Sequence, residues 1–70
     1  MDLTIVELEK EYIIKNVLVD DGELSDFLFT LGCYSGEPIT VISRKKSHVI
    51  VAIKDARYSI DTSLAKAIIV

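Results

Sequence analysis

The sequence predicts a mainly β domain: a small closed barrel with one helix inserted after the first strand. In the C-terminal half, segments rich in Val and Ile alternate with brief turns, as the short strands of a small barrel do. One stretch, from Asp20 to Gly32, instead repeats its apolar residues at helical spacing. A chain of 70 residues can enclose only one hydrophobic core, so we expect a single domain over residues 1–70.

The N-terminal part has mixed patterning. Leu3–Leu8 combines four apolar side chains with Thr4 and Glu7, and we interpret it as a segment packed on the barrel. Tyr12–Val19 is rich in Ile and Val, which predicts the first strand.

The helix is predicted by its start, its apolar stripe and its end. Asp20 and Glu23 stand three apart, as a capping box requires, and Asp21 is an alternative cap. Gly32 follows the last apolar residue of the stripe, where helices often end in a left-handed residue. The stripe occupies positions i, i+3, i+4 and i+7 and should face the core: Leu24, Phe27, Leu28 and Leu31.

After the helix the apolar residues alternate with a period of two, which is typical of strands. Arg44–His48 and Asp55–Ala56 are the predicted turns between them, and Thr62–Lys66 is predicted to form one helical turn. The predicted strands are Ile39–Ser43, Val49–Ile53, Arg57–Asp61 and Ala67–Val70.

Composition disfavours several classes of protein. The net charge is -3, and the only basic cluster, Arg44-Lys45-Lys46, lies where a solvated hairpin tip is expected, so we expect no nucleic-acid binding. The apolar runs Val49–Ile53 and Ala67–Val70 are far too short to span a bilayer, and the N-terminus has no signal-peptide pattern. A single cysteine, Cys33, fits a reducing compartment, so we expect a cytoplasmic protein.

The sequence contains no convincing catalytic motif. One His, one Cys and no G-x-S-x-G sequence give no convincing nucleophile with an oriented base. No phosphate-binding loop of the G-x-x-x-x-G-K-[ST] kind occurs either. We therefore expect a binding protein rather than an enzyme.

One segment resembles a known family. The segment after the helix reads Leu31-Gly32-Cys33-Tyr34-Ser35-Gly36 and is followed by Ile39-Thr40-Val41. It resembles the L-G-x-x-x-G-x-x-I-x-V signature of FeoA domains. In that family the first glycine ends a helix and the second opens a strand. The likeness covers residues 12–70. Family members often have Pro where this chain has Ser35 and Gly where it has Asp55-Ala56, and their helix is often basic where this one is acidic and aromatic. The C-terminal half is also similar, at Ile53-Lys54, Tyr58-Ser59-Ile60, Ala65, Ile68 and Val70.

This resemblance implies both a fold, the SH3-like barrel, and a function in iron uptake. It implies a non-enzymatic accessory or regulatory protein of ferrous iron uptake, which binds the cytosolic part of FeoB, a membrane iron permease with a GTP-binding domain. The location implied is the cytoplasm, at the inner face of the membrane, without insertion into it. One alternative is a metal-responsive regulatory domain akin to the C-terminal barrel of DtxR-type repressors. Another is a generic SH3-like peptide-binding module, which is weakened by the presence of only five aromatic residues.

Metal ligands are few and scattered. Cys33 and His48 could bind Fe(II) or Zn(II), but no C-x-x-C or H-x-x-H spacing accompanies them. The acidic group of Asp20, Asp21, Glu23 and Asp26 could bind a divalent ion through oxygen, although capping the helix explains it better. We expect no required cofactor, and weak binding of Fe(II) or another divalent transition metal at most.

Phe29 is the strongest candidate for a contact with the permease. It lies about 150° from the centre of the apolar stripe at 100° per residue. Tyr34 follows in the loop after the helix and Asp26 lies beside Phe29 on the helical wheel, so these three residues are the predicted partner surface. The alternative is that Phe29 packs under the N-terminal segment through Leu3, Ile5 or Leu8.

Overall fold

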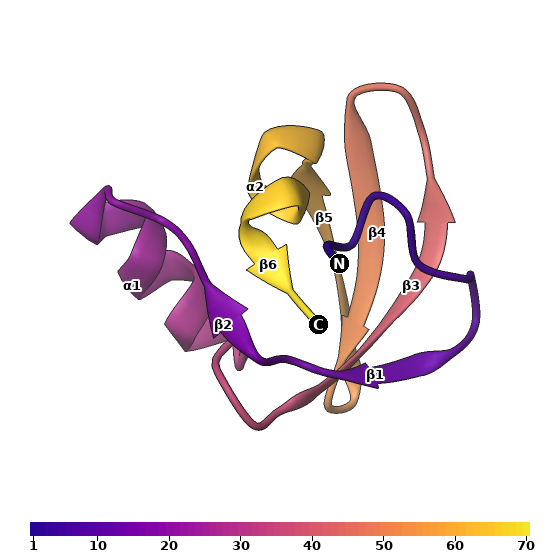
Figure 1. Ribbon diagram of the computed structural model, residues 1–70, viewed down its shortest axis with the longest axis horizontal. Coiled ribbons are helices and arrows are strands. Elements are labelled where there is room, and N and C mark those ends of the chain that lie inside the picture. Colours follow the sequence, from indigo (N-terminus) through magenta and orange to yellow (C-terminus); the bar gives the residue numbers. More distant parts are fainter.

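A computed structural model describes residues 1–70. It contains a four-stranded antiparallel sheet in the order β1-β3-β4-β5 and a two-stranded antiparallel sheet of β2 and β6, with two helices (Figure 1). In chain order the elements are β1 (Glu11–Ile13), β2 (Asn16–Val17), α1 (Gly22–Leu31), β3 (Pro38–Arg44), β4 (His48–Ile53), β5 (Ala56–Asp61), α2 (Thr62–Ala67) and β6 (Ile68–Ile69).

The predicted first strand is in fact two strands in different sheets. β1 pairs with β3, and β2 pairs with β6. At the crossing, Ile14 N–H donates to the Glu37 carbonyl at 2.9 Å, while Lys15 N–H donates to the Ile69 carbonyl at 2.7 Å. The prediction of one strand over Tyr12–Val19 is therefore wrong in extent, because an unbroken Val/Ile pattern does not say where the chain changes its partner.

The two C-terminal hairpins confirm the predicted strands. Val51 of β4 lies opposite both Val41 of β3 and Tyr58 of β5, and a bulge interrupts β3 between Val41 and Ser43. The β4–β5 turn differs by one residue from the prediction, since β5 begins at Ala56 and Lys54 adopts a φ of 56°. The predicted helical turn after β5 is α2.

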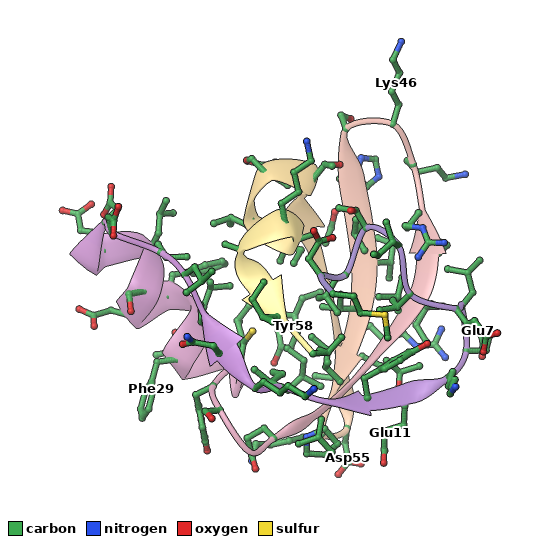
Figure 2. All side chains as sticks on the ribbon, in the orientation of Figure 1. Glu7, Glu11, Phe29, Lys46, Asp55 and Tyr58 are labelled. Carbon is green, nitrogen blue, oxygen red and sulfur yellow. The ribbon has the colours of Figure 1, made fainter.

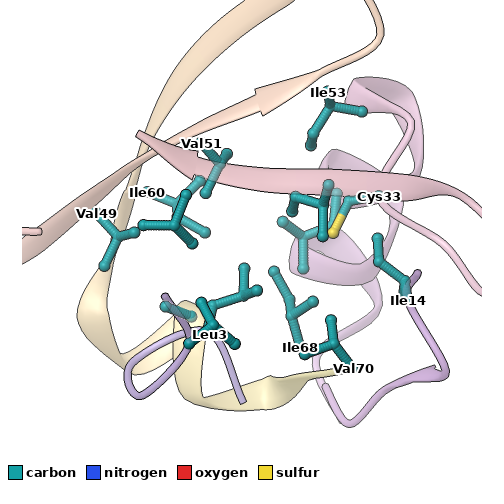
Figure 3. Packing of buried hydrophobic residues seen from close by; sticks show 14 residues of the cluster. Leu3, Ile14, Cys33, Val49, Val51, Ile53, Ile60, Ile68 and Val70 are labelled. Carbon is teal, nitrogen blue, oxygen red and sulfur yellow. The ribbon is translucent and has the colours of Figure 1, made fainter. Parts of the chain in front are cut away.

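The core gathers side chains from both sheets, both helices and the N-terminal segment (Figure 3). Leu3 and Val6 are almost completely buried, which confirms that the N-terminal segment packs on the barrel. The fourteen buried residues are Leu3, Val6, Ile14, Leu28, Cys33, Ile39, Val41, Val49, Val51, Ile53, Ile60, Ala65, Ile68 and Val70.

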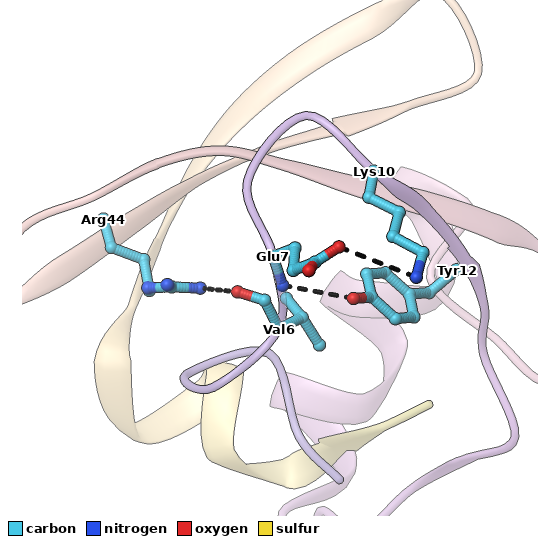
Figure 4. Close-up of polar contacts among 5 residues, drawn as sticks. All are labelled: Val6, Glu7, Lys10, Tyr12 and Arg44. Carbon is cyan, nitrogen blue, oxygen red and sulfur yellow. Dashed lines mark hydrogen bonds and ion pairs between the residues drawn. The ribbon is translucent and has the colours of Figure 1, made fainter.

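Polar contacts hold the N-terminal segment in place (Figure 4). Arg44 Nη1 donates a hydrogen bond to the Val6 carbonyl at 2.5 Å, and the Tyr12 hydroxyl accepts one from Glu7 N–H at 3.1 Å. Lys10 Nζ lies 3.6 Å from Glu7 Oε2. The segment is thereby tied to β1 and β3, away from α1.

Helix α1 begins and ends as the sequence predicts, with Asp21 rather than Asp20 as the cap. Asp21 Oδ1 accepts hydrogen bonds from Glu23 N–H at 2.9 Å and Leu24 N–H at 3.3 Å. Gly32 ends the helix in the left-handed region, with a φ of 93°. None of the helices is long and apolar enough to cross a membrane.

The apolar stripe of α1 is only partly covered. Leu28 is buried and Leu31 half-buried, but Leu24 is 39% exposed and Phe27 47% exposed. Figure 1 shows the reason: α1 projects from the side of the molecule, and its N-terminal half extends beyond the sheets. The prediction that all four side chains face the core is therefore wrong for Leu24 and Phe27.

Candidate functional site

Phe29 lies on the surface of α1, where it is 63% exposed and points away from the sheets (Figure 2). It does not pack under the N-terminal segment, so that alternative is wrong. The segment instead bonds to other elements: Leu3 N–H donates to the Ala65 carbonyl at 3.2 Å, and Glu9 N–H donates to the Val41 carbonyl at 2.8 Å.

Phe29 and Tyr34 form a stacked aromatic pair. Their ring centroids are 4.8 Å apart and their planes differ by 30°. The loop that carries Tyr34 is fixed by backbone hydrogen bonds, from Cys33 N–H to the Leu28 carbonyl and from Gly36 N–H to the Ile14 carbonyl, at 2.9 and 2.8 Å. The sequence therefore predicts correctly that Phe29 and Tyr34 share a surface, and the fixed loop holds the pair in one arrangement.

A charged pair borders the aromatic rings. Lys54 Nζ donates to Glu37 Oε1 at 2.5 Å and lies 5.9 Å from the centre of the Tyr34 ring. This hydrogen bond lowers the pKa of Glu37 and raises the pKa of Lys54. Both groups therefore stay charged at neutral pH, and the lysine is anchored beside the stack.

Gly32 allows the β4–β5 hairpin to approach the end of α1. A Cβ at this position would lie 2.9 Å from Lys54 Cε and 3.0 Å from Ile53 Cγ2, closer than van der Waals contact permits. The glycine thus has two reasons to be there, the left-handed turn and the close approach of the hairpin.

An open groove of about 560 Å³ lies between α1 and this hairpin. Phe29, Leu31 and Tyr34 line it on the helix side, while Ile53, Lys54 and Tyr58 line it on the hairpin side. Three of the five aromatic residues of the chain are among them. The sequence does not reveal the hairpin wall, because no local pattern in β4 or β5 indicates that they meet the end of α1.

Asp26 is exposed on α1, as predicted. Its backbone carbonyl accepts a hydrogen bond from Thr30 Oγ1 at 3.1 Å, and neither ion pair of the structure includes its carboxylate. Its charge is therefore available to a partner.

The candidate metal ligands do not come together. Cys33 is 2% exposed, and burial raises the pKa of its thiol to about 11, so the metal-binding thiolate is disfavoured. His48 begins β4, at the far end of the β3–β4 hairpin from the Cys33 loop. No group of three or more His, Cys, Asp or Glu side chains is arranged to hold an ion. The residues present thus do not fit a tight Fe(II) or Zn(II) site.

Comparison with known proteins identifies the family. The profile of the FeoA domain matches residues 1–70. No curated protein matches the sequence.

Solved structures share the fold. A crystal structure of an iron uptake regulatory protein (FeoA) has a TM-score of 0.84 at 19% identity, covering 97% of this chain and 91% of that one. Stenotrophomonas maltophilia FeoA complexed with zinc, described as a procaryotic SH3 domain protein, has a TM-score of 0.83 at 20% identity, covering 99% and 87%. A manganese-dependent transcriptional repressor has a TM-score of 0.85 at 17% identity, and the match covers 97% of this chain but 39% of the repressor.

These likenesses confirm the predicted mainly β, SH3-like fold. The family match extends over the whole sequence and includes the Leu31–Gly36 segment that carries the two left-handed glycines. The chain belongs to the FeoA domain family.

Proposed function

We propose that this chain is a non-enzymatic accessory protein of ferrous iron uptake, which binds the cytosolic part of a FeoB-type permease at the inner face of the membrane. Membership of the FeoA family supports the process. The exposed stack of Phe29 on Tyr34 supports the contact surface, with Asp26 at its edge.

The stack has the physical properties of an interface anchor. Aromatic side chains dominate binding energy when a partner desolvates them, and Phe29 has most of its surface available for that. The backbone hydrogen bonds of the Tyr34 loop hold the pair in place before binding, so less conformational entropy is lost on association. Asp26 would add long-range electrostatic attraction rather than much affinity.

The test is a titration of this chain with the cytosolic domain of the FeoB-type permease from the same genome. Phe29→Ala should weaken binding by roughly 1–3 kcal/mol, a factor of about 5 to 150. Folding should change little, because the stack contributes only about 0.5–1.5 kcal/mol. Ile5→Ala is the matched control, since Ile5 is 67% exposed on the N-terminal segment and should bind as the wild type does. Equal binding by Phe29→Ala and the wild type would refute this contact surface.

The groove favours one second candidate, a peptide-binding module. Its three aromatic side chains resemble the lining that extended peptides use in SH3-like domains. Tyr58→Ala alters the hairpin wall and leaves the Phe29–Tyr34 stack in place. If the groove captures a peptide segment of the partner, Tyr58→Ala should weaken binding of the partner as strongly as Phe29→Ala does. We do not propose a metal-responsive role, because Cys33 and His48 lie apart.

A further inference from the structure

Helix α1 exposes large apolar side chains on two sides. At 100° per residue, Leu24 and Phe27 lie on one side of the buried Leu28, and Phe29 lies on the other. Phe27 and Phe29 are therefore about 160° apart around the helix axis. Their exposed fractions are 47% and 63%, so the rest of the chain covers neither side of the projecting helix completely.

The segment that contains α1 has no basic residue, and the lysine that lies near the C-terminal end of the helix, Lys54, is paired with Glu37. Between Asn16 and Ser43 the sequence has no Lys, Arg or His. Four carboxylates lie in or just before α1, and neither ion pair of the structure uses them: Asp20, Asp21, Glu23 and Asp26. The nearest basic cluster along the chain, Arg44-Lys45-Lys46, is at the tip of the β3–β4 hairpin, where Figure 2 shows Lys46 far from α1.

We propose that α1 docks as an inserted helix in an apolar groove of a protein partner, and that Lys and Arg side chains rim this groove. A flat contact at Phe29 alone would leave Leu24 and Phe27 in water, whereas a groove would cover both sides of the helix. Opposite charge at the rim would complement the unpaired carboxylates. This mode of docking rests on the proposed function, which supplies the partner.

Two other occupants fit the surface less well. A second copy of this chain would bring the four carboxylates of one α1 against the four of the other, and like charges in apposition disfavour wrong partners. An anionic lipid surface would repel the same group of carboxylates.

The test extends the titration with the cytosolic domain of the FeoB-type permease from the same genome. Phe27→Ala should weaken binding at least about tenfold, as Phe29→Ala does, because each residue fills one side of the groove. Ile5→Ala is the apolar control. Glu23→Lys should slow association at low salt, and this effect should shrink at high salt, where charges are screened. Glu11→Lys, an exposed charge on β1, is the charge control and should have little effect. Circular dichroism checks that each variant is folded.

Three results would overturn the inserted-helix mode, and they are distinguishable. If Phe29→Ala weakens binding and Phe27→Ala does not, the helix is contacted on one side only and the proposed function stands. If light scattering shows a wild-type dimer that Phe27→Ala dissociates, a second copy covers that side of α1. If the wild-type chain does not bind the permease domain at all, the proposed function fails and this mode fails with it.

Discussion

Gly32→Ala should destabilise the fold through two separable effects. Its φ of 93° is left-handed, which costs an L residue about 1–2 kcal/mol. The added Cβ would also lie 2.9 Å from Lys54 Cε and 3.0 Å from Ile53 Cγ2. The Lys54 side chain is 58% exposed and can move aside by giving up its ion pair with Glu37, whereas Ile53 is 2% exposed and packed in the core. Overpacking of this kind costs about 1–3 kcal/mol.

The expected total for Gly32→Ala is thus about 2–5 kcal/mol, against a whole-domain stability of roughly 4–10 kcal/mol for a chain of this length. Gly36→Ala is the matched control, because Gly36 has the same φ of 93° and no atom within 4 Å of the added Cβ. Gly36→Ala should lower the free energy of unfolding only by the cost of the left-handed backbone, about 1–2 kcal/mol.

Urea unfolding followed by circular dichroism measures both variants, and thermal unfolding should show a larger drop for Gly32→Ala, at about 4–8 °C per kcal/mol. Equal losses in the two variants would refute the contact between the glycine and the hairpin. A smaller loss for Gly32→Ala than for Gly36→Ala would refute the account altogether.

Three further predictions follow from the helix cap, the buried thiol and the scattered metal ligands. Asp21→Ala should lower the free energy of unfolding by about 1 kcal/mol, and Asp20→Ala, which removes no cap, should leave it nearly unchanged in the same urea assay. Burial raises the pKa of Cys33 from 9.0 to about 11, so the folded state retains a proton that the unfolded state releases. The free energy of unfolding should therefore fall by roughly 2–3 kcal/mol as the pH rises from 9 towards 11, and this contribution is fully present below pH 9. Cys33→Ala should abolish this part of the pH dependence. A chelator should leave the melting temperature unchanged, because no group of three or more His, Cys, Asp or Glu side chains is arranged to bind an ion, and a fall of many degrees would reveal a site that the geometry does not suggest.

The features that the sequence predicts well are determined by residues close together in the chain. The cap at Asp21, the left-handed end at Gly32 and the hairpins that follow depend on turn and capping chemistry within a few residues. The break between β1 and β2 depends instead on hydrogen bonds to Glu37 and Ile69, far along the chain. Phe29 and Tyr34 are close in the chain, so the sequence places them on one surface. Lys54 and Tyr58 are distant from them in the chain, so the sequence does not.

The failure of pattern reasoning at the helix stripe is informative because of its position. Leu24 and Phe27 have the spacing of core residues, yet the rest of the chain leaves them substantially exposed. Local rules and the global fold agree in most of a natural protein, and departures concentrate at functional sites, where stability is given up for binding. Leaving two large apolar side chains in water costs solubility, so a partner that covers them is the simplest physical reason for their presence. In the docking mode proposed above, the stripe belongs to an interface that the partner completes. Substituting both residues by polar side chains should therefore preserve folding and abolish binding.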